Sequence, residues 1–122
     1  MRGAIIRFAR WLRTQFEFPI RVPVYLLAGE QVRTMDGGRC SASIFAPWSK
    51  MHEPYIRIAT GDWKQYSAGH SRDDALAGYL GSLAHELVHY RQWIETGKMW
   101  ERGVAVKASR LVDRYPLTVD HP

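Results

Sequence analysis

Two histidines and a glutamate form the pattern H-E-x-x-H at His85, Glu86 and His89. Residues four apart on an α-helix lie about 40° apart around its axis, so both imidazoles would project from one face. Zinc accepts imidazole ligands, and Glu86 flanks the histidines and could reach a water molecule on such an ion. The pattern therefore predicts a zinc site, whereas the alternative is a surface helix with two unrelated histidines.

A catalytic zinc site needs a third protein ligand, and Glu101 is the first candidate. It follows His89 across an expected turn at Gly97, so an antiparallel return of the chain would bring it to the metal. Its expected place within an apolar helical stripe also requires a cationic partner, because an isolated buried charge is unfavourable. Without a metal, Glu101 would instead favour the helix dipole from the first turn.

Other ligand candidates are weaker. Glu95 also follows the histidines, but it points away from His89 if the helix continues, which makes it solvent-facing. The remaining histidines, each in or near an expected loop, are His52, His70 and His121.

The helix that positions the pattern is expected at residues 72–96. Ser71 and Asp74 resemble a capping box at its start, and Thr96-Gly97 is typical of a helix end. One face is an apolar stripe, and a second face is small before His85 and aromatic after it, which leaves room for a ligand or another chain. The stripe consists of Leu76, Leu83, Leu87 and Ile94, and the second face contains Gly78, Ser82 and Trp93.

The remaining elements predict an α+β fold that forms a single domain over residues 1–122. A basic amphipathic helix at 2–17 would pack behind a sheet, although a targeting segment or a membrane-surface helix is the alternative. Three strand candidates suit a small antiparallel or mixed sheet, with a hairpin signal at 35–38 and a polar loop at 61–70. The strands are Arg21–Ala28, Cys40–Trp48 and Tyr55–Thr60, and a last helix spans Met99–Tyr115 before Pro116.

Composition sets broader limits. The chain has 122 residues, 46% of them hydrophobic, which is enough for one core. No apolar run approaches the roughly 20 residues that span a bilayer. Cys40 is the single cysteine and allows no intrachain disulfide, so a reducing, cytoplasmic location is expected. The net charge of +5 permits nucleic acid, a membrane surface or another acidic partner without selecting one.

The sequence H-E-L-V-H on a long helix, a glycine turn and a following glutamate resemble a gluzincin metallopeptidase. The element order is most similar to the single-domain minigluzincins, with an active-site helix and a glutamate helix, although the specific matches lie within residues 85–101. The resemblance implies one zinc per chain held by His85, His89 and Glu101. It also implies that Glu86 is general base and acid in the cleavage of an extended peptide or protein substrate.

The chain departs from the larger gluzincins at Ala105, where they often carry an acidic residue that orients a ligand histidine. Support for the ligands must therefore come from elsewhere. The residue that stabilises the oxyanion stays open among three candidates. They are Tyr66, His70 and Tyr115.

Two other functions remain open. Metallopeptidases associated with DNA–protein crosslinks also use H-E-x-x-H, but with a third histidine, and none follows His89 until His121. A zinc-binding regulatory or interaction module with little turnover is the second alternative. The tail at 116–122 is expected to be extended, where it would either fray or occupy the cleft and make the protein a latent zymogen.

Overall fold

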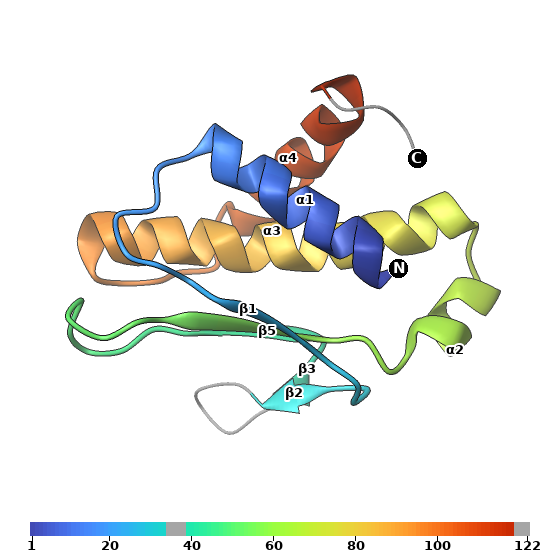
Figure 1. Cartoon of the computed structure of the whole chain (residues 1–122), viewed down its shortest axis with the longest axis horizontal. Helices are drawn as coiled ribbons and strands as arrows, with labels where there is room; N and C mark the ends of the chain where they lie inside the picture. The colour runs from blue at the N-terminus through green and yellow to red at the C-terminus, as the bar shows by residue number, and fades with distance from the viewer. Residues whose placement is uncertain (34–38, 119–122) are drawn as a thin grey trace.

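The computed structural model describes residues 1–33 and 39–118 and shows helices packed on a small sheet (Figure 1). This arrangement confirms the expected α+β class. The helices are α1 (Arg2–Gln15), α2 (Trp63–Ala68), α3 (Arg72–Thr96) and α4 (Val104–Thr118). The strands are β1 (Val24–Leu27), β2 (Val32–Arg33), β3 (Arg39–Cys40), β4 (Ala42–Phe45) and β5 (Tyr55–Ala59).

The main sheet is mixed and has the strand order β1-β5-β4. The central strand β5 pairs in parallel with β1 and antiparallel with β4. Its alternation places Ile56 and Ile58 in the core, with 1% and 0% of their surface exposed. All three predicted strands are present, each shorter than its apolar segment. A separate pair, β2–β3, flanks the expected hairpin turn, which lies outside the described residues.

Helix α3 has the predicted bounds because its ends are set by local chemistry. The Ser71 hydroxyl accepts a hydrogen bond of 3.1 Å from the backbone N–H of Asp74. At the other end Gly97 has a φ of 78°, which a glycine adopts without a steric cost. Leu83 and Leu87 are buried as expected. Residues of α3 outside the apolar stripe are buried as well, among them Tyr90, whose hydroxyl donates to the Ile20 carbonyl.

The helix α1 crosses α3 on the side away from the sheet (Figure 1). Its buried side chains are Ile5, Phe8, Trp11 and Leu12. The arginines of α1 are exposed, as expected for a basic amphipathic helix with one packed face. Its partner is therefore mainly another helix, whereas the sequence predicted a sheet. Among the described residues, no helix combines the length and the apolar character needed to span a membrane.

One prediction about the surroundings of α3 is wrong, and the predicted room on its second face is confirmed only in part. The segment 61–70, expected as a loop, contains α2, and the Tyr66 ring lies against Gly78. A Cβ atom on Gly78 would stand 2.7 Å from the Tyr66 hydroxyl oxygen, so the small face before His85 is covered there. Trp93 is buried, with its indole N–H donating 3.2 Å to the Pro47 carbonyl. At Gly78 and at Trp93 this face of α3 is therefore covered by the chain's own elements, whereas a cavity of about 110 Å³ remains beside Ser82.

The last helix is displaced along the sequence. It begins at Val104 rather than at residue 99, because Gly103 has a φ of 79° and interrupts the helix before it. It continues through Pro116 to Thr118, although a proline at this place removes one helical hydrogen bond and its ring crowds the preceding turn. The extended tail expected from residue 116 is therefore wrong up to Thr118, and residues 119–122 lie outside the described part of the chain.

Candidate metal centre

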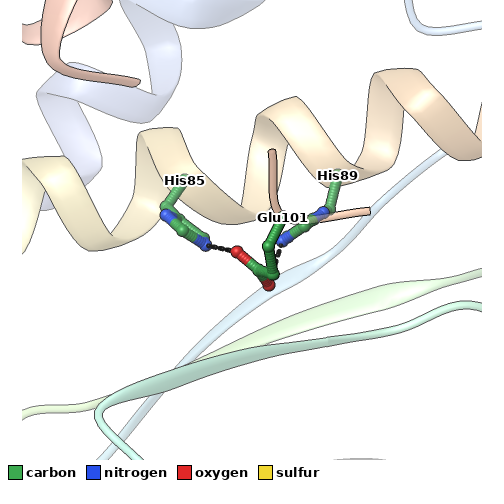
Figure 2. A group of neighbouring side chains, drawn as sticks. All are labelled: His85, His89 and Glu101. Carbon is green, nitrogen blue, oxygen red and sulfur yellow. Dashed lines mark hydrogen bonds and ion pairs between the residues drawn. The ribbon is translucent and has the colours of Figure 1, made fainter. Parts of the chain in front are cut away.

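His85 and His89 project from the same side of α3, as their spacing predicts (Figure 2). Their ring centroids are 5.0 Å apart. The His85 side chain is 31% exposed and the His89 side chain is 7% exposed. The His89 imidazole is therefore buried, whereas the His85 imidazole is partly exposed to solvent.

The Glu101 carboxylate lies between the two imidazoles (Figure 2). One of its oxygens is 3.1 Å from Nε2 of His85, and the other is 2.9 Å from Nε2 of His89. The candidate ligand atoms of these three residues all lie within 4.8 Å of one another. The structure thus brings together the three residues that the sequence analysis named, in a group that could hold a metal ion.

The segment 97–103 carries Glu101 back along α3 to the histidines. A glycine with positive φ stands at each end of it, Gly97 at 78° and Gly103 at 79°. The Glu101 carbonyl accepts a hydrogen bond of 3.1 Å from the N–H of Val104, the first residue of α4. The predicted antiparallel return is confirmed. The predicted place of Glu101 in an apolar helical stripe is wrong, because it precedes the helix and its side chain is 75% exposed.

The spacing of these atoms fits a metal ion. Zinc binds imidazole nitrogen and carboxylate oxygen at about 2.0–2.2 Å, which separates tetrahedral ligand atoms by about 3.3 Å. The observed separations of 2.9 and 3.1 Å are slightly shorter. A zinc ion would require slightly larger separations, and the Glu101 side chain, which is 75% exposed, is the ligand candidate least enclosed by the fold. Three protein ligands would leave a fourth position free for water or substrate.

Glu86 is buried beside the group, with 8% of its surface exposed. Burial raises the pKa of its carboxyl group to about 7, and the nearby Glu101 carboxylate adds to this rise. His89 and a hydrogen bond with the backbone of Ile44 act in the opposite direction. A carboxyl group in this environment can both take up and release a proton near neutral pH.

A residue that the sequence analysis did not select also contacts the group. The Gln92 side-chain oxygen lies 3.0 Å from Nδ1 of His89 and accepts a 3.0 Å hydrogen bond from the backbone N–H of Trp100. The spacing of Gln92, three residues from His89, was the available signal, since such residues are neighbours on a helix.

The other candidates lie apart from this group. Glu95 is 65% exposed and pairs with Arg91 at 3.7 Å, as the solvent-facing prediction requires. His52 and His70 are exposed and do not join the cluster, and His121 lies outside the described residues.

The three oxyanion candidates differ in their surroundings. Tyr115 packs against Phe8 and Trp11 at the junction of α1 and α4, away from the histidines. The His70 ring stacks on Tyr66, with centroids 4.5 Å apart. Tyr66 lines a cavity of about 110 Å³ together with Ser82, one turn before His85 on α3. Of the three candidates, Tyr66 is thus the one that shares a cavity with a residue of α3.

No protein-family model, curated protein or solved structure matches the chain.

Proposed function

We propose that the chain is a zinc-dependent endopeptidase of the gluzincin type, in which His85, His89 and Glu101 are the metal ligands. The observation that carries this proposal is that the Glu101 carboxylate lies 3.1 Å from Nε2 of His85 and 2.9 Å from Nε2 of His89, with all candidate ligand atoms within 4.8 Å of one another. This donor set suits zinc, and three ligands with one open position are typical of catalytic rather than structural zinc sites.

Zinc, when bound, would polarise the scissile carbonyl and lower the pKa of a water molecule. Glu86 would hold the proton that this water gives up and deliver it to the leaving amine. Its position supports this role, because it is buried next to the ligands and fixed by a hydrogen bond with the Ile44 backbone. A general base in such a place is shielded from bulk water and has a defined direction.

An extended peptide is the substrate class that the neighbouring sheet would accept. The strand β4 is at an edge of the three-stranded sheet, and it carries the Ile44 backbone that reaches Glu86. On β4, Ile44 lies opposite Ile56 of β5. The Ala59 N–H donates to the Ser41 carbonyl, and hydrogen-bonded and non-hydrogen-bonded pairs alternate along an antiparallel ladder. The Ile44 N–H therefore points away from β5. A peptide strand beside β4 would therefore lie next to the general base.

The gluzincin pattern is modified in this chain, because the ligand glutamate stands in the turn before α4 instead of on a helix. The identity of the three ligand residues is the same, and only the backbone that presents Glu101 differs. A turn that is closed by two glycines with positive φ holds the residue in place of a helical scaffold.

The test compares wild type with Glu86→Gln in metal analysis and in cleavage of a fluorogenic peptide library with zinc present. Glu86→Gln should keep about one zinc per chain and lose about 10²–10⁴-fold in cleavage rate, since it removes a proton acceptor but no ligand. Glu95→Gln, an exposed carboxamide substitution on the same helix, is the matched control. Zinc binding without cleavage by wild type would favour a zinc-binding module, and absence of zinc would contradict the site.

A further inference from the structure

We propose that Gln92 is a positioning residue of the metal centre. Its side-chain oxygen holds the Nδ1–H of His89 and the backbone N–H of Trp100 at the same time. It thereby fixes a ligand from α3 and the segment that carries Glu101 in one arrangement. This inference rests on the proposed zinc site, and it assigns a role to a residue outside the H-E-x-x-H pattern.

The chemistry of the two contacts defines which atom of the Gln92 amide faces them. The backbone N–H of Trp100 can only donate, and its partner lies 3.0 Å away. The partner must therefore be the amide oxygen, because the opposite orientation would set two N–H donors against each other.

The same oxygen fixes the tautomer of His89. It lies 3.0 Å from Nδ1, and an oxygen acceptor at this distance requires a hydrogen on that nitrogen. A neutral imidazole carries one N–H, so with that hydrogen on Nδ1 the lone pair on Nε2 is available to a metal ion. Without an ion, the Glu101 oxygen is a second acceptor that competes with Gln92 for the hydrogen. Nε2 is the nitrogen that faces Glu101 at 2.9 Å. Gln92 therefore presents to the metal the nitrogen that lies inside the ligand group.

Burial makes this contact effective. Both Gln92 and His89 are 6% exposed, so water does not compete for either hydrogen bond. The amide nitrogen of Gln92 is also buried and has no hydrogen-bond partner among the described residues. An unsatisfied buried N–H₂ group is unfavourable, so the side chain contributes through its oxygen rather than through its nitrogen.

The contact also joins the two halves of the site. Trp100 directly precedes Glu101, and Glu101 is largely exposed, so few other contacts restrain its carboxylate. A hydrogen bond from the Trp100 N–H to an atom that also holds His89 ties the loop ligand to the helix ligand. Gln92 thereby supplies the ligand support that an acidic residue at position 105 would give, where this chain has the exposed Ala105.

The test uses two substitutions of similar length. Gln92→Met removes the acceptor, and Gln92→Glu keeps one while adding a negative charge that the zinc ion offsets. We expect Gln92→Met to lower zinc affinity by about 10–100-fold in competition with a chromogenic chelator, and Gln92→Glu to restore it towards wild type. Glu95→Met, an exposed change on the same helix, is the matched control and should bind zinc as wild type does.

A second readout does not depend on zinc affinity or on turnover. Nitrogen NMR of labelled histidine should show His89 with its hydrogen on Nδ1 in the metal-free Glu101→Ala protein at about pH 8, where the Glu101 carboxylate no longer offers Nε2 an acceptor. Adding Gln92→Met to this variant should abolish the preference. A purely structural role for Gln92 would change stability without moving the tautomer.

Each result decides the question. Unchanged zinc affinity in Gln92→Met, together with an unchanged tautomer when Gln92→Met is combined with Glu101→Ala, would overturn the role. A hydrogen on Nε2 of His89 in Glu101→Ala alone would overturn it as well. If Gln92→Met does not fold, the Glu101→Ala spectrum and the Gln92→Glu affinity give the answer. If wild type binds no zinc, the proposed function fails by itself, and the metal-free spectra still test whether Gln92 fixes His89.

Discussion

The Nε2 atom of His89 lies 2.9 Å from a carboxylate oxygen of Glu101, although a helix end and a reversal of the chain separate the two residues. His89 is nearly buried, whereas the Glu101 side chain is 75% exposed. The pair therefore joins a fixed element to one that remains open to solvent. A metal ion could enter from the exposed side and meet an imidazole that is already oriented.

Removing Glu101, the proposed ligand in the segment 97–103, should weaken zinc binding strongly. Glu101→Ala is expected to lower zinc affinity by more than about 100-fold, beyond the range observed for residues that only support a ligand. Glu95→Ala is the matched control, because this carboxylate is 65% exposed and pairs with Arg91. Isothermal titration with zinc checks both variants. Equal losses in the two variants, or a loss in Glu95→Ala alone, would contradict the ligand assignment.

The two proposed ligands on α3, His85 and His89, should both be required for zinc binding. His85→Ala and His89→Ala are each expected to reduce bound zinc from about one per chain to a small fraction, because each removes one of three protein ligands. Elemental analysis after gel filtration measures the content directly. His52→Ala serves as the control, since His52 is exposed and stands outside the ligand group. Full zinc content in either helix variant would mean that the metal binds elsewhere.

Local chemistry explains why α3 and its histidines could be predicted. The Ser71 cap and the Gly97 end need only neighbouring residues, and the spacing of His85 and His89 sets a common face on any helix. The approach of Glu101 was predicted as well, since a turn after Gly97 sends the chain back along α3. These features depend on short stretches of sequence.

The features that were missed depend on distant partners. The helix α2 forms where Tyr66 packs on Gly78, and nothing within the segment 61–70 indicates that contact. The parallel pairing of β1 with β5 joins segments separated by three other strands. The role of Gln92 needs the Trp100 N–H, which meets it only after the chain has turned back. The apolar spacing around Glu101 is typical of a helix, so the sequence predicted a helix from residue 99 and not the interruption at Gly103.

The turn that presents Glu101 should depend on glycine. Gly103→Ala would place a Cβ on a residue with φ of 79°, which costs roughly 1–2 kcal/mol in the left-handed region. We expect it to lower the free energy of unfolding by that amount and to weaken zinc binding, because Glu101 lies two residues away. Urea denaturation of the metal-free protein measures the first effect, and chelator competition the second.

Gly81→Ala is the control for this prediction. Gly81 lies within α3, and a Cβ atom there would meet nothing within 4 Å. The substitution should therefore raise stability by about 0.5–1 kcal/mol, as expected for a glycine replaced in a helix. If both alanine variants shift stability in the same direction, the positive φ of Gly103 is not what holds the turn.

The hydrogen bond from the Tyr79 hydroxyl to Asp62 should make the free energy of unfolding fall at alkaline pH. Burial raises the pKa of Tyr79 well above its ordinary value, and a hydrogen bond to the Asp62 carboxylate adds to the rise. A group with a raised folded-state pKa stabilises the fold below its unfolded pKa of about 10, and this contribution falls as pH increases beyond that value.

Tyr79→Phe removes the ionisable group and should cost about 1 kcal/mol at neutral pH. Above about pH 10, wild type should lose stability faster than Tyr79→Phe, so the difference between them narrows. Urea denaturation between neutral and alkaline pH measures both curves, and parallel curves would show that Tyr79 ionises as easily in the folded chain as in the unfolded one.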